Sequence, residues 1–140
     1  MSEEQAQQLM QQMQMLETYF SDLSQREATF MNVLRESTAA IESIKGLGQQ
    51  EESETLVPMG IGTFVKAKLL PNEKFVINVG AGASVEKDKD SVINYLESRM
   101  KEIEIALRET TAKKQEVMAN LEQGKQEMNR LVAKSKTKKQ

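Results

Sequence analysis

The 140-residue sequence contains no cysteine, no histidine and no tryptophan. These absences exclude a thiolate nucleophile, a Ser-His-Asp triad, a disulfide and a zinc site built from Cys and His. With four Phe and two Tyr, stacking on single-stranded nucleic acid has few side chains to use. An enzyme is therefore the least favoured class of function, and we expect no cofactor, no bound metal and no catalytic residues.

Long apolar runs are also missing. No stretch approaches the roughly 18 apolar residues that cross a bilayer. The start, Met1-Ser2-Glu3-Glu4, lacks the basic and then apolar pattern of a signal peptide. We therefore expect a cytoplasmic protein that does not enter the membrane, and a chain without cysteine fits that compartment.

Glycine and proline are confined to the middle of the chain. Six of the seven glycines and both prolines lie between Gly46 and Gly82, and only Gly124 lies later. This distribution predicts a helix, an extended segment and a second helix. The expected divisions are a coiled-coil helix over 1–48, a β-hairpin segment over 49–88, a second coiled-coil helix over 89–133 and a basic tail over 134–140.

Both predicted helices carry an apolar stripe with alternating steps of four and three residues. Nine of eleven stripe positions in the first and nine of twelve in the second are apolar. A mean spacing of 3.5 residues keeps such a stripe against a partner helix. The nearly equal lengths predict an antiparallel pair. The stripe positions are Leu9, Met13, Leu16, Phe20, Leu23, Glu27, Phe30, Leu34, Ser37, Ile41 and Ile44, and then Ile93, Leu96, Met100, Ile103, Leu107, Thr110, Lys114, Val117, Leu121, Gly124, Met128 and Leu131.

In this pairing Leu9 would lie near Met128 and Ile44 near Ile93. Residues 1–48 carry seven acidic and three basic side chains, whereas residues 89–140 carry eight acidic and twelve basic ones. An acidic helix beside a basic one gains flanking ion pairs and avoids pairing with its own copy. Because an exposed ion pair contributes only roughly 0–1 kcal/mol, the charge contrast selects a partner more than it stabilises the pair.

The middle segment alternates apolar and polar residues as β-strands do. Residues 55–58 lead into 61–69, where Lys66 and Lys68 lie opposite an apolar face. Turns are expected at Leu70–Glu73 and at Gly80–Gly82. The pattern predicts two consecutive hairpins with about four short strands, followed by a helix capped at Asp88 or Asp90. The apolar face is expected to comprise Ile61, Val65, Ala67 and Leu69 in the first hairpin, and Phe75, Ile77 and Val79 in the second.

An isolated small sheet is marginally stable in water, and one thin coiled coil cannot cover this apolar face. Exposed strand edges also pair readily with other chains. We therefore predict that the hairpins join other chains in a larger sheet or barrel; the alternative is that they fold back on the base of their own helices. The expected oligomerisation residues are Leu56, Val57, Ile61, Phe64, Val65, Leu69, Phe75, Ile77 and Val79.

The helix ends away from the β segment hold a second apolar set. Met is flexible and polarizable, so it suits a surface that accepts apolar partners of many shapes. The alternative is a frayed coiled-coil end without function. The residues expected to bind such partners are Leu9, Met10, Met13, Met15, Leu16, Met118, Leu121, Met128, Leu131 and Val132.

Other motifs carry little chemistry. The stretches 60–65 and 79–85 resemble a dinucleotide fingerprint but lack its third glycine and a βαβ unit. Carboxylates such as Glu51 and Glu102 lie in a polar linker or on an outer helical face, where solvated charge is expected. The lysine-rich stretch 134–139 is expected to be a disordered, solvated tail.

The middle segment resembles the alpha-class subunit of prefoldin, of the archaeal type. Residues 54–69 contain the pattern Leu-Val-Pro-x-Gly-x-Gly-x-Phe-Val, and residues 76–87 contain Val-Gly-x-Gly-x-x-Val-Glu-Lys. The long heptad helices on either side match as well, so the resemblance covers essentially the whole chain. It implies an α+β fold in which a long antiparallel two-helix coiled coil is joined by two β-hairpins that assemble into an intersubunit β-barrel.

The resemblance also implies a function and partners. The function is that of a molecular chaperone subunit, which holds non-native proteins without ATP and delivers them to a group II chaperonin. The partners are those client proteins, the chaperonin, and prefoldin beta subunits, four of which form a hetero-hexamer with two alpha subunits. Neither nucleic acid nor a membrane is an expected partner.

Two other functions remain open at this point. A coiled-coil structural adaptor or spacer would bind one defined partner and would protect no unrelated unfolded protein from aggregation. A nucleic-acid-associated coiled coil would use the lysine tail and bind duplex DNA in a salt-dependent manner.

Overall fold

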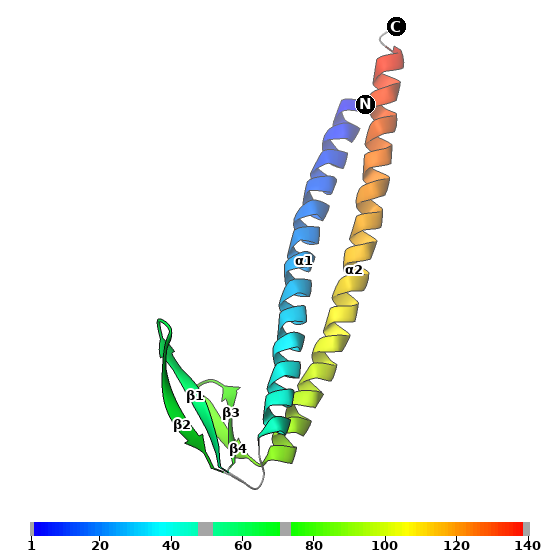
Figure 1. The fold of residues 1–140 in the computed structure, drawn as a ribbon. Helices are drawn as coiled ribbons and strands as arrows, with labels where there is room; N and C mark the ends of the chain where they lie inside the picture. The colour runs from blue at the N-terminus through cyan, green and yellow to red at the C-terminus, as the bar shows by residue number, and fades with distance from the viewer. Residues whose placement is uncertain (1, 48–51, 71–73, 139–140) are drawn as a thin grey trace. The chain divides into compact units, whose positions relative to one another are not determined.

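The computed structural model describes residues 2–47, 52–70 and 74–138 of the chain. Two long helices enclose four strands in sequence (Figure 1), which confirms the predicted α+β class. The elements are helix α1 (Ser2–Gly46), strands β1 (Ser53–Gly60), β2 (Thr63–Leu69), β3 (Phe75–Gly80) and β4 (Ala83–Lys87), and helix α2 (Lys89–Lys138).

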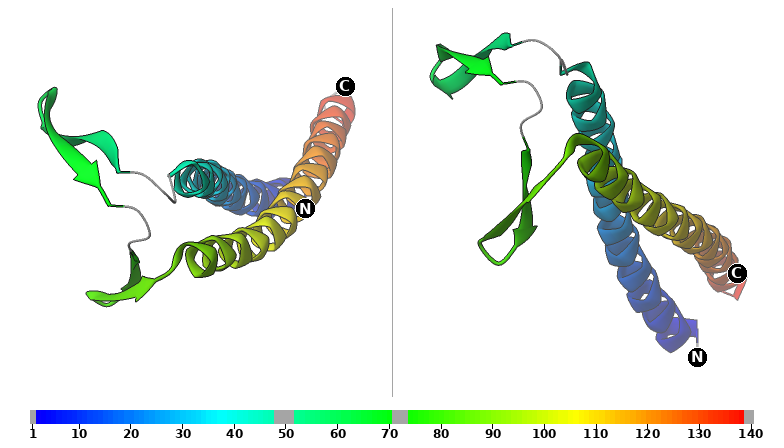
Figure 2. Two further views of the ribbon diagram at one scale, coloured as in Figure 1. Left: turned by 60° about the horizontal axis from the view of Figure 1, so that its bottom comes forward. Right: turned by 90° about the horizontal axis from the view of Figure 1, so that it is seen from below.

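The chain divides into two compact units. The coil unit consists of Met1–Val33 and Ile103–Gln140, and the hairpin unit consists of Leu34–Glu102. In each unit a segment of α1 packs against a segment of α2 that runs in the opposite direction (Figures 1 and 2). The antiparallel pairing predicted from the stripes is therefore confirmed within each unit.

The apolar stripes form the packed seam. Every stripe position of both helices is buried or half-buried, whereas most residues between them are exposed. The most buried side chains are Leu23 and Val117 in the coil unit, and Ile41 and Val92 in the hairpin unit. Burial thus follows the 3.5-residue period that the sequence shows.

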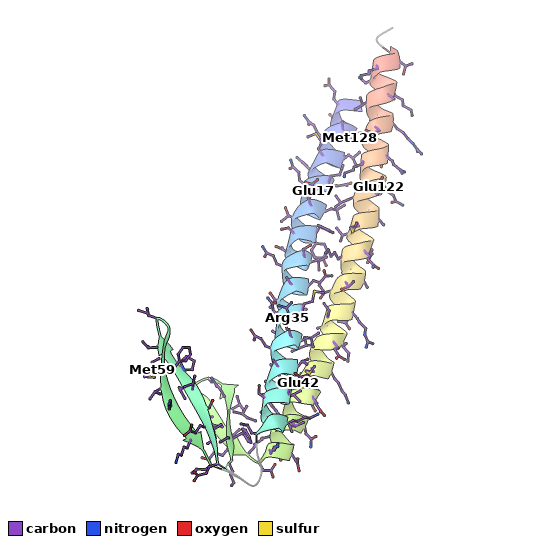
Figure 3. All side chains as sticks on the ribbon, in the orientation of Figure 1. Glu17, Arg35, Glu42, Met59, Glu122 and Met128 are labelled. Atoms are coloured by element: carbon purple, nitrogen blue, oxygen red, sulfur yellow. The ribbon has the colours of Figure 1, made fainter. Side chains whose placement is uncertain are left out.

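A close contact sets the register of the coil unit. A Cβ on Gly124 would lie 3.1 Å from Cγ of Met13, so the glycine leaves room for the methionine side chain. Leu9 lies four residues before Met13, and Met128 lies four residues after Gly124. Because the helices are antiparallel, the predicted pairing of Leu9 with Met128 has the same register. Figure 3 shows Glu17 of α1 near the level of Glu122 of α2, which agrees with this alignment.

One polar layer interrupts the apolar seam of the coil unit. Glu27 Oε1 lies 3.1 Å from Lys114 Nζ, and Glu27 Oε2 accepts a 2.9 Å hydrogen bond from Thr111 Oγ1. Lys114 Nζ also lies 5.2 Å from the centroid of the Phe20 ring. The hydrogen bonds from Thr111 and then from Lys114 hold the pKa of Glu27 below its ordinary value. Because these polar groups find partners only in one alignment, the layer specifies the register.

Among residues 2–47, 52–70 and 74–138 the structure records one ion pair, between Glu27 and Lys114. The flanking ion pairs expected from the charge contrast between the helices are therefore not formed in that part of the chain. Exposed Lys and Glu side chains gain little from holding one geometry and remain solvated.

In the hairpin unit, side-chain hydrogen bonds satisfy backbone groups at the end of α1 and at the start of α2. Lys89 Nζ donates hydrogen bonds to the carbonyl oxygens of Lys45 (3.2 Å) and Leu47 (3.1 Å), and carbonyls at a helix C-terminus lack intrahelical partners. At the start of α2, Asp88 Oδ1 accepts a 2.8 Å hydrogen bond from the Ser91 N–H. This confirms the predicted cap at Asp88. Hydrogen bonds from the Ser91 side chain and backbone lower the pKa of Asp88.

The strands form two separate antiparallel hairpins, β1 with β2 and β3 with β4 (Figure 2). Each closes with a two-residue loop whose residues both have positive φ. The values are 48° and 71° for Ile61-Gly62, and 53° and 76° for Ala81-Gly82. Positive φ at both positions matches the twist of paired strands, as in a type I′ turn. The two consecutive hairpins predicted from the sequence are confirmed.

Ile61 differs from its prediction. It was expected on the apolar face of a strand, but it forms the tip of the loop between β1 and β2, since Gly60 and Gly62 allow the chain to turn there. The Thr63 hydroxyl donates a hydrogen bond to the Gly60 carbonyl and holds the loop closed. The strand therefore begins two residues later than the alternation suggests.

The basic tail also differs. Residues 134–138 continue α2 as a helix, whereas a disordered tail was expected. Lysine has good helix propensity, and its charge interacts favourably with the C-terminal end of the helix dipole. The predicted turn at 71–73, the boundary at 48–49, the linker residue Glu51 and Lys139 lie outside the described residues.

We predict that Gly124→Ile destabilises the coil by roughly 1–3 kcal/mol, because the added side chain overpacks against Met13. Urea unfolding of the full chain measures this loss. Met13→Ala in the same chain should recover part of it, whereas Asn120→Ile on the exposed surface of α2 should cost little. Equal stability of Gly124→Ile and the unmodified chain would refute the close contact.

A second prediction concerns pH. Since the folded state lowers the pKa of Glu27 from 4.5, its stabilisation is complete above that value and is lost as pH falls through the folded-state pKa. The melting temperature should therefore fall as the pH drops below 4.5, and less steeply in Glu27→Gln. Glu17→Gln, which removes an exposed carboxylate of α1, is the control. A pH profile unchanged by Glu27→Gln would contradict the role of this layer.

Candidate functional site

The β1–β2 hairpin presents apolar side chains on both of its faces. Residues directly opposite each other in a hairpin share a face. Val57 pairs with Val65, and Ser53 with Leu69, on one face; Leu56 pairs with Lys66 on the other, where Pro58 also pairs with Phe64. Val57, Val65, Leu69, Leu56 and Phe64 are all exposed. Neither face is therefore covered within the described chain.

The β3–β4 hairpin differs in this respect. Ile77 pairs with Val85 and Phe75 with Lys87 on its apolar face, and Phe75 and Ile77 are half-buried. The other face pairs Val76 with Glu86 and Asn78 with Ser84, so it is mostly polar. The second hairpin therefore has one face that needs a cover, whereas the first has two.

The predicted oligomerisation residues all lie in these two hairpins, and seven of the nine are exposed. The sequence prediction omitted four further exposed apolar residues, Met59, Leu70, Val76 and Val85. Met59 lies near the end of the first hairpin (Figure 3). Its position at the bulge between Pro58 and Gly60 breaks the alternation that would have identified it.

Ile61 combines full exposure with an unfavourable backbone conformation. Its side chain is fully accessible at 105% of the reference area, and its φ of 48° lies in the left-handed region. A β-branched residue is strained there, and Asn, Asp or Gly is preferred at this loop position. An isoleucine here therefore gains nothing from the described chain, either by burial or by conformation.

The free ends of α1 and α2 hold the second predicted set. Six of its ten residues lie in the seam and are half-buried: Leu9, Met13, Leu16, Leu121, Met128 and Leu131. The other four are exposed: Met10, Met15, Met118 and Val132. Met128 is labelled on α2 in Figure 3. Further from this end, the prediction omitted Met31 and Ile105, which are exposed apolar residues outside the stripe.

Residues 2–47, 52–70 and 74–138 contain no group of three or more Asp or Glu side chains placed to hold a metal ion. In the same part of the chain, neither helix offers the long apolar stretch that crossing a bilayer requires. Most exposed apolar residues of the described chain lie on the hairpins or at the free helix ends.

Comparisons with known proteins agree with this architecture. The family model for Prefoldin, described as prefoldin subunit, matches residues 2–134. The chain is 63% identical over 132 residues to prefoldin subunit alpha of Nitrosopumilus maritimus, covering 94% of this chain and 91% of that protein.

Solved structures are similar as well. A filamentous PFD from Methanocaldococcus jannaschii, determined by cryo-EM, has 26% identity and a TM-score of 0.50, with 86% of this chain and 95% of that chain covered. The prefoldin beta subunit from Thermococcus strain KS-1 shares the fold at 14% identity, with a TM-score of 0.61 and 89% of both chains covered.

Replacement of the loop residue Ile61 should have two opposing effects, on backbone strain and on apolar burial. Ile61→Asn should relieve about 1–2 kcal/mol of backbone strain but remove an apolar side chain worth roughly 1.5–3 kcal/mol when buried. If Ile61 is buried in an assembly, Ile61→Asn should weaken that assembly several-fold. Native mass spectrometry over a dilution series measures this.

Ala81→Asn is the matched control, because Ala81 occupies the same loop position with a φ of 53° and a small side chain. It should leave assembly unchanged or strengthen it. An assembly strengthened by Ile61→Asn would show that Ile61 is not an interface residue.

Proposed function

This chain belongs to the prefoldin family, and on that premise we propose that it is an alpha-type chaperone subunit that holds non-native proteins without ATP and delivers them to a group II chaperonin. The observation that carries the proposal is an uncovered apolar surface in each of the two units. One lies on the hairpins and the other at the free helix ends. A subunit that assembles through one surface and binds clients through another requires two such surfaces.

We propose that the hairpins are the assembly region. Two-stranded sheets leave both outer edges unpaired, and such edges pair with strands of other chains. Closure into an intersubunit β-barrel would remove the edges and bury one apolar face of each hairpin. The expected partners are prefoldin beta subunits, four of which join two copies of this chain in a hetero-hexamer. The filamentous relative supports the view that this architecture suits assembly.

We propose that the free helix ends bind the clients. The exposed residues there include Met10 and Met118, and unbranched thioether side chains adapt to apolar partners of different shape. Each contact is weak, but several subunits on one client raise the overall affinity through effective concentration. This mechanism needs no nucleotide, and we propose that the subunit acts in the cytoplasm.

The test is suppression of aggregation. The full chain, co-assembled with the beta subunit of the same organism, should protect several unrelated unfolded proteins in light-scattering assays, equally with and without ATP. An adaptor for one defined partner would protect none of them. Addition of a group II chaperonin with ATP should then raise the yield of refolded client, and release without refolding would contradict delivery.

Loss of assembly should remove most of this activity. Val65→Asp/Ile77→Asp places charges on the apolar faces of both hairpins, and we expect the resulting unassembled chain to need ~100-fold more protein for equal protection. Ser84→Asp/Asn94→Asp, on the polar face of the second hairpin and on the exposed surface of α2, is the control. Circular dichroism checks that the helices remain. Equal protection by an unassembled chain would contradict the multivalent mechanism.

A further inference from the structure

The exposed apolar residues at the free helix ends are not evenly distributed around the coil. With the seam positions labelled a and d, each d follows its a by three positions and the next a follows d by four. Met10, Met118 and Val132 each directly follow a d residue, so all three occupy e positions. Because the helices are antiparallel, the e positions of both lie on the same side of the seam. We call Met10, Met118 and Val132 the e flank.

The opposite side of the same region is mostly polar. The g positions, which directly precede an a residue, hold Gln12, Asn120 and Glu127, all of them exposed, and one apolar residue, Tyr19, which is 38% exposed. Met15 and Ile105 are exposed and apolar, but each lies two residues beyond a seam position, on the outer surface of its helix. The two sides of the seam thus differ in chemistry although both are accessible to solvent.

Burial separates the e flank from the seam. Met10, Met118 and Val132 are 52%, 54% and 46% exposed, whereas the seam residues beside them are buried or half-buried. A client can therefore reach the e flank without separating the helices. Binding to the seam would first require the loss of helix packing.

The e flank extends along the coil axis. Met13 lies level with Gly124, and residue numbers run in opposite directions on the two helices. Val132 therefore lies level with Gln5, and Met118 lies level with Tyr19. At 1.5 Å per residue, Val132 and Met10 are about 8 Å apart along the axis, and Met10 and Met118 about 13 Å apart. An extended chain rises 3.3 Å per residue, so a short stretch of extended polypeptide can contact all three.

The small size of the e flank indicates its occupant. A stable interface between folded proteins buries roughly 800 Å² on each partner, and three half-exposed side chains fall far short of that. Glu17 and Lys125, of opposite charge, occupy the e positions between them, so the e flank does not complement a partner of one charge sign. A weakly held, extended apolar segment fits this surface better than a folded partner or a second copy.

Resting on the chaperone function proposed above, we propose that the e flank is the client-contacting face of this subunit and binds extended apolar segments of non-native polypeptides while the seam stays closed. The mostly polar g flank does not take part, nor does the outer surface at Ile105 and at Met15, so Met15 leaves the client-binding set predicted from the sequence. The e flank therefore gives each subunit one direction from which it receives a client.

The test compares two double variants of the full chain, each co-assembled with the beta subunit. Met10→Ser/Met118→Ser removes two residues of the e flank. Met15→Ser/Ile105→Ser removes two apolar residues of comparable or greater exposure, 73% and 56%, from the same helices but outside it. The e-flank variant should need about tenfold more protein for half-maximal protection. Each half-exposed methionine that is removed takes away about half of the binding free energy that a fully buried methionine side chain would give. The control variant should match the unmodified assembly.

A second measurement does not depend on variant stability. A photo-crosslinking amino acid at position 10 should capture an unfolded client several-fold more efficiently than one at position 15. Equal loss in the two double variants, or equal capture at the two positions, would overturn the e-flank proposal. A change in the mass of the complex in Met10→Ser/Met118→Ser would also overturn it, by showing a subunit contact. Failure of the unmodified assembly to protect any client would refute the chaperone function itself.

Discussion

Two paired helices bury only one stripe of side chains each, and this limit decides where the remaining apolar surface of the chain lies. The seam takes in the stripe residues, with Leu23, Ile41 and Val117 buried in it. No third layer exists among the described residues to cover anything else. Apolar side chains on the hairpins and on the flanks of the coil therefore remain exposed, and such surfaces mark sites of interaction. The limited packing within each unit and the exposure of these apolar surfaces have the same cause.

The hairpins show how one local design can carry two roles. The loops at Ile61-Gly62 and Ala81-Gly82 have nearly the same φ angles, and the bulges before them occupy equivalent places. The side chains differ: the first hairpin is apolar on two faces and ends in an exposed isoleucine, whereas the second is apolar on one. Similar backbones can thus fit positions in an assembly that differ in how many sides are covered.

The polar layer of Glu27, Thr111 and Lys114 fixes the register of the seam, and the register determines which residues share a side at the helix ends. It makes one alignment of α1 and α2 preferable to its neighbours, because a shift would leave charged groups without partners in a half-buried seam. That alignment places Met10 of α1 on the same side as Met118 of α2. A surface composed of residues from two helices depends on this register, so the layer that fixes the register also determines the shape of the surface.

The sequence by itself determined the order of elements, the stripes and the number of hairpins, because each follows from local spacing or turn chemistry. It also predicted most of the exposed apolar residues of the hairpins, apart from Met59, Leu70, Val76 and Val85. Tertiary structure decided what depends on contacts between distant residues. Glu27, an interruption when seen in the stripe alone, meets Thr111 and Lys114 across the seam.

Likewise, only packing separates the half-buried Met13 from the exposed Met10 in the predicted client-binding set. Ile61 was misplaced because strand alternation continues through its position, whereas two flanking glycines allow a tight loop that alternation does not reveal. A residue's type and spacing fix its local conformation and its face. Its exposure depends on which helix lies opposite and in which register, and that information is not local.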